Sequence, residues 1–290
     1  MATVYMETER QAIERDVFNK LVHEKWDMKS LVVDRAQPPF ADYNGDLFDG
    51  ARRWMGNLSG KTLLEIGCGS GELAVWFALQ GAQVTGIDVS DESIAIAKRR
   101  AEENGVAERT RFVATPAEHM PFEDASMDVI FINVSLHHLE IDQALAECNR
   151  LLKPGGSFIA VEPLVFSDTI QRIRASKFVT KLYPIRQETP TERILTVKDL
   201  DAIKAIFKNM RIIPYRILSP FIFKAKPLFH FLSRRFKGAD WESQKRACNR
   251  YIQDKDASLI ARFPFLKYLS RYIVIAGEKG HAHPLLARNV

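Results

Sequence analysis

The sequence predicts an α/β protein with a seven-stranded, mostly parallel sheet that carries helices on both faces. Short apolar runs of strand length alternate with segments of helical period along residues 60–165, a pattern typical of strand–helix–strand units. A glycine-rich turn joins the first of these strands to its helix. Asp88, Asn133 and Glu162 each end a predicted strand, and sheets of this kind bind ligands at the carboxyl ends of their strands.

The segment before the first strand predicts a helix followed by a loop. Residues 9–27 place Ile13, Val17 and Leu21 at helical spacing, which indicates an amphipathic helix. Such a helix packs on the core or forms a lid over a small-molecule site, and the sequence leaves both roles open. Residues 34–50 are predicted to be loop-like because they hold Pro38, Pro39, Asn44 and Gly45.

The first strand, Leu63–Ile66, enters the turn Gly67-Cys68-Gly69-Ser70-Gly71. Glycine allows the backbone to approach a ligand closely because it has no Cβ and tolerates positive φ. Backbone N–H groups at the start of the next helix then face that ligand. A dinucleotide-binding turn has the spacing G-x-G-x-x-G. Here the third glycine comes one residue earlier and Glu72 stands in its place, so the spacing disfavours NAD.

The second strand, Gln83–Asp88, ends in a carboxylate. A carboxylate at this strand end can accept hydrogen bonds from the two hydroxyls of a ribose. Ser90 then predicts the N-cap of a helix, and Gly105 its C-terminal stop. The site therefore suits a ligand that contains a nucleoside.

The stretch after the third strand, Thr110–Val113, reads Ala-Thr-Pro-Ala-Glu-His-Met-Pro-Phe over residues 114–122. Together with the glycine turn, the segment Val-Ser-Leu-His-His-Leu at 134–139 and the turn Leu-Lys-Pro-Gly-Gly at 152–156, it resembles the class I S-adenosylmethionine (SAM) dependent methyltransferases of the ubiquinone–menaquinone type. The resemblance covers about residues 60–165 and the last strands loosely. It implies a Rossmann-like fold, SAM as the cofactor and a lid before the turn.

The resemblance also implies which residues hold the cofactor. Glu65 and the backbone of the turn would hold the methionine part, Asp88 the ribose, and residues 115–118 the adenine. The full implied set is Glu65, Gly67, Cys68, Gly69, Gly71, Asp88, Val89, Thr115, Ala117, Glu118 and Asn133. Pro116 departs from the family pattern, which has an aspartate there for the adenine amino group. Proline offers neither a side-chain acceptor nor an N–H, so Thr115, Glu118 or the backbone of Ala117 must replace that contact.

The predicted reaction centre lies between Asn133 and His138, after the fourth strand, Asp128–Asn133. Histidine suits the removal of a hydroxyl proton at neutral pH, so His137 or His138 is a candidate general base. Both rings could instead be structural. The two residues are adjacent and point in different directions, so at most one is expected to face the acceptor. Glu162 could orient the substrate or a histidine, or simply begin a helix.

Composition limits the possible classes of protein. Hydrophobic residues make up 46% and charged residues 27%, which is typical of a globular chain. The three cysteines are far apart, so neither a disulfide framework nor a metal site is expected. The N-terminus lacks an apolar leader and no run has the length of a membrane span, so we expect a cytoplasmic protein.

The expected organisation is a helical lid at 1–50, a SAM-binding core at 51–165, and the rest of the fold at 166–290. The last two strands are predicted at 210–218 and 272–278, with a helical insertion between them. This insertion, residues 219–271, has twelve Lys and Arg against four Asp and Glu, with phenylalanines interleaved. It could cap an acceptor pocket, contact a membrane surface, which would make the protein peripheral there, or bind nucleic acid.

The expected function is methyl transfer from SAM to a small-molecule or lipid-like acceptor. Transfer to oxygen is the first expectation, because a histidine at the reaction centre would be useful there; transfer to carbon or nitrogen remains open. Two other classes stand beside it: an RNA methyltransferase, for which the basic insertion would bind phosphates, and a SAM-binding protein without catalysis. The absence of Pro-Pro-Tyr or Pro-Pro-Phe after Asn133 argues against the amino-methyltransferases that act on nucleic-acid bases.

Overall fold

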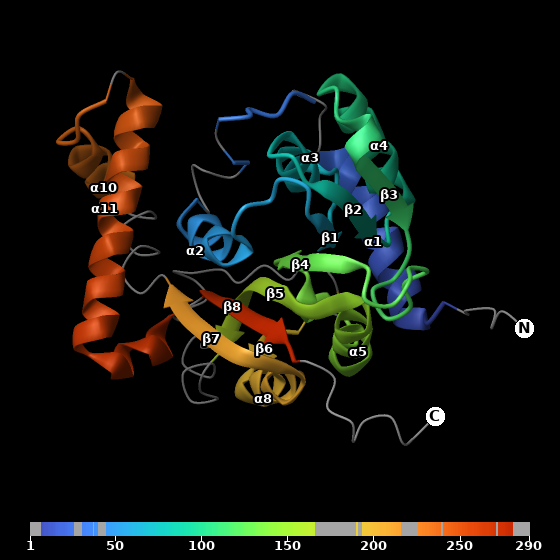
Figure 1. Ribbon diagram of the computed structural model, residues 1–290. Coiled ribbons are helices and arrows are strands. Elements are labelled where there is room, and N and C mark those ends of the chain that lie inside the picture. Colours follow the sequence, from blue (N-terminus) through green and yellow to red (C-terminus); the bar gives the residue numbers. More distant parts are fainter. Residues whose placement is uncertain are drawn as a thin grey trace, which may run out of the picture.

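The computed structural model describes residues 7–25, 31–36, 38–39, 45–165, 190, 193–215, 226–238, 240–270 and 272–280 (Figure 1). One sheet has the strand order β3-β2-β1-β4-β5-β8-β7. Its strands are β1 (Thr62–Ile66), β2 (Gln83–Asp88), β3 (Thr110–Ala114), β4 (Met127–Asn133), β5 (Leu152–Val165), β7 (Phe207–Tyr215) and β8 (Tyr272–Lys279). On this path β8 is antiparallel to both of its neighbours and the other pairs are parallel. The predicted seven-stranded, mostly parallel sheet is confirmed, and a short β6 (Leu195–Thr196) also pairs with β5.

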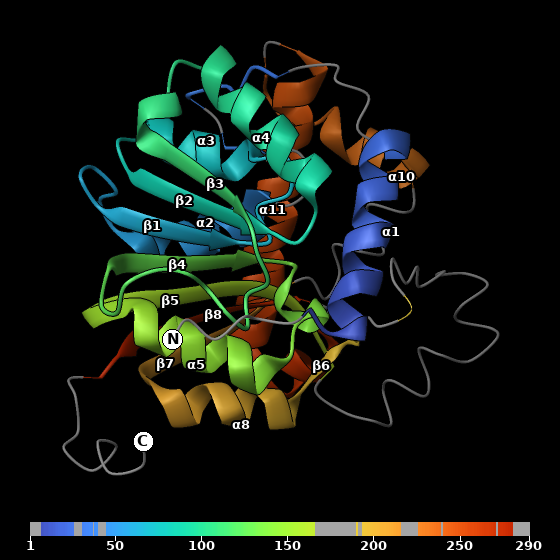
Figure 2. The same cartoon turned by 90° about the vertical axis from the view of Figure 1, so that its right-hand side faces the viewer.

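Side chains along the central strand β4 point alternately to the two faces of the sheet, and each face has its own hydrophobic core. Val129 and Phe131 belong to one core, whereas Ile130 and Ile132 belong to the other, because successive strand residues point to opposite faces. The first core is closed by α2 (Gly45–Met55), α3 (Glu72–Leu79) and α4 (Asp91–Glu103), and the second by α5 (Ile141–Leu151) and α8 (Val197–Ile206) (Figure 2). The helices on both faces are therefore as predicted.

The N-terminal helix α1 (Glu9–Lys25) confirms the helix predicted for this segment. It runs past the carboxyl ends of the parallel strands (Figure 2). Polar contacts fasten it there: Gln11 Nε2 lies 3.0 Å from Glu118 Oε2, and Ser90 Oγ donates to Asn19 Oδ1 at 2.7 Å. Ser90 also caps α4, as predicted, by accepting from the Ser93 N–H.

The predicted loop at 34–50 is wrong at its carboxyl end, where α2 begins at Gly45. Leu47, Phe48, Ala51 and Met55 recur at helical spacing and are all buried. The Phe48 ring lies 5.9 Å from the Phe77 ring, inside the first core. Burial of this apolar stripe outweighs the poor helix propensity of the glycines.

The strand predicted at 210–218 also begins earlier than expected. Helix α8 ends at Ile206, and β7 starts at Phe207. Phe207 is buried, and its ring stacks on that of Phe158 at 4.4 Å, so packing against β5 fixes the strand start. Asn209, with φ of 53°, lies at a register shift near that start. Residues 216–218 lie outside the described part of the chain.

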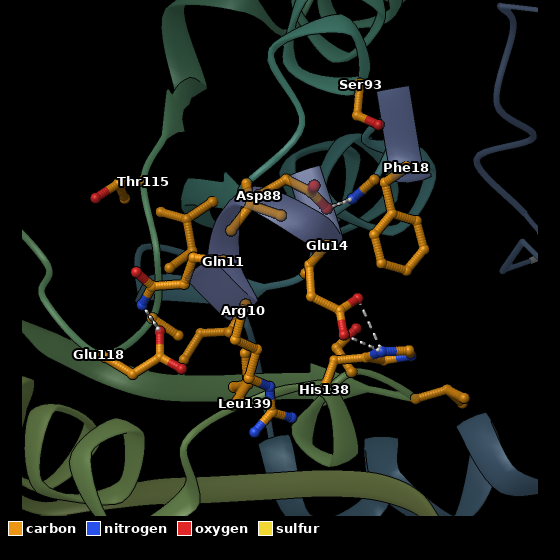
Figure 3. A pocket seen from close by; sticks show the side chains of 18 of the residues that line it. Arg10, Gln11, Glu14, Phe18, Asp88, Ser93, Thr115, Glu118, His138 and Leu139 are labelled. Carbon is orange, nitrogen blue, oxygen red and sulfur yellow. Dashed lines mark hydrogen bonds and ion pairs between the residues drawn. The ribbon is translucent and has the colours of Figure 1, made fainter. Parts of the chain in front are cut away.

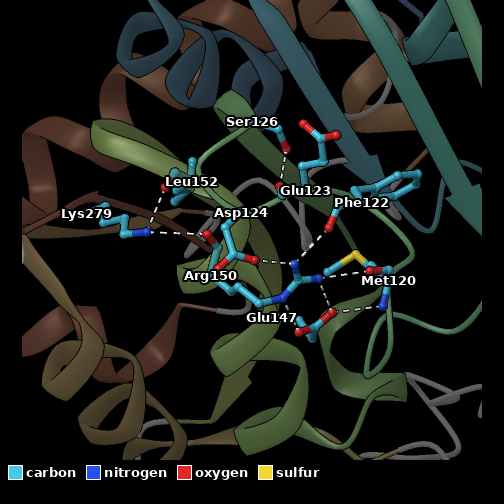
Figure 4. A network of polar contacts seen from close by, with 9 residues as sticks. All are labelled: Met120, Phe122, Glu123, Asp124, Ser126, Glu147, Arg150, Leu152 and Lys279. Atoms are coloured by element: carbon cyan, nitrogen blue, oxygen red, sulfur yellow. Dashed lines mark hydrogen bonds and ion pairs between the residues drawn. The ribbon is translucent and has the colours of Figure 1, made fainter. Parts of the chain in front are cut away.

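A charged network in α5 holds the loop that follows β3 (Figure 4). Arg150 Nη2 donates to the Met120 carbonyl at 2.9 Å, and Arg150 Nη1 donates to the Phe122 carbonyl at 2.8 Å. Glu147 accepts from Arg150 Nε at 2.7 Å and from the Met120 N–H at 2.8 Å. Burial alone would raise the pKa of Glu147, but these hydrogen bonds outweigh it and hold that pKa below its ordinary value.

The predicted insertion is helical where it is described, with α10 (Lys226–Ser233), α11 (Trp241–Arg262) and the 3-10 segment η3 (Pro264–Leu269). Asp240 caps α11 by accepting from the Ser243 N–H at 2.7 Å. Helix α11 lies along the side of the sheet that carries α2 (Figure 1). Residues 219–225, 239 and 271 lie outside the described part. Of the helices described, none has the length and apolar character that crossing a bilayer requires.

Candidate active site

A cavity of about 360 Å³ lies at the carboxyl ends of β1, β2 and β4, with α1 forming one wall (Figure 3). This volume is within the range of about 300–1,000 Å³ that is usual for small-ligand pockets. Eight of the predicted site residues line it: Gly67, Gly69, Asp88, Val89, Thr115, Ala117, Glu118 and His138. The structure thus brings together residues from four separate segments of the sequence.

Six other predicted site residues do not line this cavity. They are Glu65, Cys68, Gly71, Asn133, His137 and Glu162. Cys68 and Glu65 are buried beneath the turn, and Gly71 faces α4 instead. The structure therefore gives these six residues supporting positions around the cavity wall.

The glycine turn is shaped by close contacts that exclude side chains. Gly67 has φ of 69°, and a Cβ placed on it would lie 2.2 Å from Ser135 Oγ. Gly71 has φ of 77°, and its Cβ would lie 2.7 Å from the Cβ of Ala97 in α4. The turn therefore offers bare backbone to the cavity on one side and to α4 on the other.

We expect Gly71→Ala to destabilise the protein more than Gly105→Ala. Both glycines have left-handed backbone, with φ of 77° and 65°, so alanine incurs a cost of about 1–2 kcal/mol at each. Around Gly105 there is open space, whereas at Gly71 the new methyl group meets Ala97 and adds an overpacking cost of about 1–3 kcal/mol. Urea unfolding of the two variants measures the difference. Equal decreases in the free energy of unfolding would contradict the argument that the Gly71 methyl group overpacks against Ala97.

Asp88 is positioned by two backbone donors. Its Oδ2 accepts from the Gly69 N–H and its Oδ1 from the Ser90 N–H, both at 2.9 Å. Burial raises the pKa of Asp88 above its ordinary value, although these N–H groups partly offset the effect. A carboxylate has about four acceptor positions, so Asp88 retains acceptor capacity beyond these backbone contacts.

Glu65 lies behind the turn and is only 2% exposed. Burial, and then the nearby charge of Asp88, raise the pKa of Glu65 well above its ordinary value. Its Oε2 has no hydrogen-bond partner within the described ranges. A buried polar atom of this kind requires a hydrogen-bond partner, so the turn suits a ligand that supplies one directly or through a bridging water.

His137 is a buried structural residue in this structure. Its Nδ1 lies 2.7 Å from Glu162 Oε2, and Glu162 is fully buried. Glu162 Oε1 accepts from the N–H groups of Ser135 and Leu136, at 2.9 and 2.7 Å. Of the roles considered for Glu162, the structure therefore shows the orientation of a histidine, and this pair fixes the loop that follows β4.

His138 faces the cavity and contacts α1 (Figure 3). Its Nδ1 lies 3.2 Å from the Glu14 carboxylate, and its ring meets the Phe18 ring edge-on at 5.4 Å. In the tautomer whose Nδ1–H donates to Glu14, Nε2 is the basic nitrogen of the neutral ring. Val134, four residues before His138, also lines the cavity and has φ of 56°, a strained conformation for a β-branched residue.

The sequence analysis left a lid role open for α1 but named none of its residues as site residues. The α1 residues that line the cavity are Arg10, Gln11, Glu14, Phe18, Leu21 and Val22. From Gln11 to Leu21 they follow one another at steps of three and four, the spacing of one helix face, and Arg10 and Val22 adjoin the two ends. The apolar part of that spacing was visible in the sequence and fitted either role, but polar Gln11 and Glu14 gave no sign of facing a cavity.

The candidates for an adenine contact have the following positions. Glu118 lines the cavity, and each of its oxygens has one donor already, because Oε2 accepts from Gln11 and Oε1 accepts from the Glu140 N–H at 2.8 Å. Thr115 and Ala117 line the cavity, whereas Pro116 does not. Within the described ranges, no residue of the basic insertion lines this cavity and no His, Cys, Asp or Glu cluster is placed to hold a metal ion.

Comparison with known proteins finds similarity over the part of the chain that contains most of this site. A family profile described as "Methyltransferase domain" matches residues 64–160. The ubiquinone/menaquinone biosynthesis C-methyltransferase UbiE of Brucella anthropi is 33% identical over 162 residues, which cover 54% of this chain and 59% of that protein. The ubiquinone biosynthesis O-methyltransferase of Chromobacterium violaceum is 35% identical over 147 residues, which cover 50% of this chain and 60% of that protein. The chain thus spans less than two thirds of the length of these relatives.

Solved structures show the same fold at low sequence identity. The geranyl diphosphate C-methyltransferase of Streptomyces coelicolor A3(2), in complex with S-adenosyl-L-homocysteine, has a TM-score of 0.55, 19% identity, and coverage of 95% of this chain and 100% of that chain. The [4+2]-cyclase SpnF has a TM-score of 0.51, 22% identity, and coverage of 81% and 80%. These solved structures show the fold, and the profile with the two curated relatives identifies residues 64–160 as a methyltransferase domain similar to SAM-dependent methyltransferases.

Proposed function

We propose that the protein transfers a methyl group from SAM to a hydroxyl oxygen of a small-molecule acceptor. The observation that carries this proposal is that Asp88 and His138 line one cavity, Asp88 held by the backbone of the turn and His138 by Glu14. The relatives named for ubiquinone and menaquinone biosynthesis support a small acceptor of quinone-like or lipid-like character.

The chain supplies binding, orientation and proton transfer. SAM brings a sulfonium that already activates the methyl group. Asp88 would bind the ribose hydroxyls, and the bare backbone of the turn around Gly67 and Gly69 would contact the methionine part. His138 Nε2 would accept the proton of the acceptor hydroxyl, while Glu14 stabilises the resulting imidazolium. Phe18 and its neighbours on α1 would exclude water from the reacting atoms.

Transfer to carbon is a second candidate, favoured by the likeness to UbiE, which is named as a C-methyltransferase. Removal of the proton of a ring hydroxyl raises the nucleophilicity of the oxygen and of the adjacent ring carbons, so the same His138 would serve either outcome. Mass spectrometry and NMR of the product distinguish them, because an O-methyl ether and a C-methyl group have different chemical shifts.

The first test is calorimetric titration of the purified protein with S-adenosyl-L-homocysteine, with NAD as the parallel control. Micromolar binding of the first and none of the second is expected. Transfer of labelled methyl from SAM to candidate quinols then tests catalysis. The fold also occurs in the [4+2]-cyclase SpnF, so fold alone does not assign chemistry. Binding without transfer to any acceptor would favour a SAM-binding protein, and transfer to RNA would favour a nucleic-acid methyltransferase.

A further inference from the structure

The end of the insertion exposes a cluster of large apolar side chains, residues 262–269, here named the aromatic tip. Phe263 is 43% exposed, Phe265 64%, Tyr268 44% and Leu269 46%. None of the residues of η3 is buried. Single exposed apolar residues are common on protein surfaces, but a contiguous group of this kind marks an interaction site.

The charge of the aromatic tip is entirely positive. The Arg262 guanidinium lies 5.9 Å from the centroid of the Phe263 ring, and Lys267 Nζ lies 5.3 Å from that of Tyr268. The sequence from 257 to 271 has no Asp or Glu, and the preceding acid, Asp256, is only 3% exposed. Exposed aromatic rings therefore stand directly beside cations, in a stretch of sequence that has no carboxylate.

The aromatic tip is also preformed. It follows the 22-residue helix α11 directly and lies at the opposite end of that helix from α10 (Figure 1). Its backbone is closed by hydrogen bonds from the Leu266 N–H to the Phe263 carbonyl at 2.9 Å and from the Ser270 N–H to the Lys267 carbonyl at 3.1 Å. A surface whose backbone is already ordered loses little conformational entropy when it binds.

We propose that the aromatic tip docks onto the surface of a bilayer that contains anionic lipids. Aromatic side chains prefer the headgroup region of a bilayer, where the apolar part of the ring contacts lipid and its polar part contacts water. Adjacent cations are attracted to anionic headgroups. The exposed Phe265 and Leu269 fit an apolar interface better than the phosphates of a nucleic acid, which would leave them in water. This docking does not depend on the proposed methyl transfer, although it would suit an acceptor of lipid-like character.

Co-sedimentation with lipid vesicles tests the docking. The full chain is mixed with vesicles of phosphatidylcholine alone or with added phosphatidylserine, and the pelleted fraction is measured. We expect pelleting with the anionic vesicles that weakens as salt is raised. The double variant Phe265→Ser/Lys267→Glu should lose at least tenfold in partitioning. Both side chains are exposed, so the fold should be retained, which calorimetric titration with S-adenosyl-L-homocysteine and thermal unfolding check.

The matched control is Val197→Ser/Lys198→Glu on α8, which removes an apolar residue that is 41% exposed and reverses one exposed lysine. It makes the same change in net charge and should pellet like the wild type. Equal pelleting of the wild type and the tip variant would overturn the proposal, and so would the absence of wild-type pelleting with either vesicle. A wild-type dimer that the tip variant converts to a monomer, without vesicle binding, would show instead that the tip joins two copies of the chain.

Discussion

Replacing His138 by alanine is expected to lower kcat by about 10²–10⁴-fold, the usual contribution of a positioned general base. Affinity for S-adenosyl-L-homocysteine should be largely retained, because the expected cofactor contacts come from the turn, Asp88 and the loop after β3. Steady-state methyl transfer to the acceptor on which the wild type turns over, combined with calorimetric titration, measures both quantities. Glu14→Gln should lower kcat by a smaller factor, since it leaves the ring but removes the carboxylate that orients it.

The variant His137→Ala is the control for His138→Ala. The two histidines are adjacent, but His137 does not line the cavity and is bonded to the buried Glu162. Its removal should cost about 1–3 kcal/mol of folding free energy, because it leaves a buried carboxylate oxygen without its partner. Any loss of rate should follow from displacement of the loop after β4. Full activity in both histidine variants would show that the base lies elsewhere or that none is required.

The choice between the two histidines illustrates what sequence reasoning could not provide. Asn133–His138 could be placed at the reaction centre because a strand of recognisable length precedes it. Which ring faces the acceptor depends on partners that lie 25 positions away for Glu162 and 124 positions away for Glu14. No local pattern reports such contacts, so the tertiary structure alone separates His138 from His137.

The same distinction between local and distant contacts explains which other features could be predicted from the sequence and which could not. The strands, the glycine turn and the Ser90 cap were predictable, because apolar period, glycine spacing and capping chemistry are local. The extent of α2 and the start of β7 were missed, because burial of Phe48 and stacking of Phe207 on Phe158 decide them. Glu118 was a candidate for the adenine contact, and nothing in the sequence indicated that its two oxygens also hold α1 and the start of α5.

Replacing Asp88 by alanine is expected to weaken binding of S-adenosyl-L-homocysteine by at least about tenfold. Hydrogen bonds to a charged group contribute about 1.5–3 kcal/mol, which corresponds to roughly 10- to 150-fold in affinity. The substitution also removes the acceptor of the Gly69 N–H, so the turn loses the contact that sets its distance from β2. Calorimetric titration measures the change, and Asp91→Ala, three residues further on and exposed, is the control that should bind normally.

The pH dependence of cofactor binding provides an independent test of the proposed role of Asp88. The carboxylate form accepts both the backbone N–H groups and the ligand hydroxyls, and protonation removes part of that capacity. Because burial raises the pKa of Asp88, its protonation begins at a higher pH than that of an exposed aspartate, whose pKa is about 3.9. Affinity for S-adenosyl-L-homocysteine should therefore fall as pH is lowered, before the protein unfolds, and the fall should be absent in Asp88→Ala. An equal fall in both proteins would assign the pH dependence to another group and remove this support for ribose binding by Asp88.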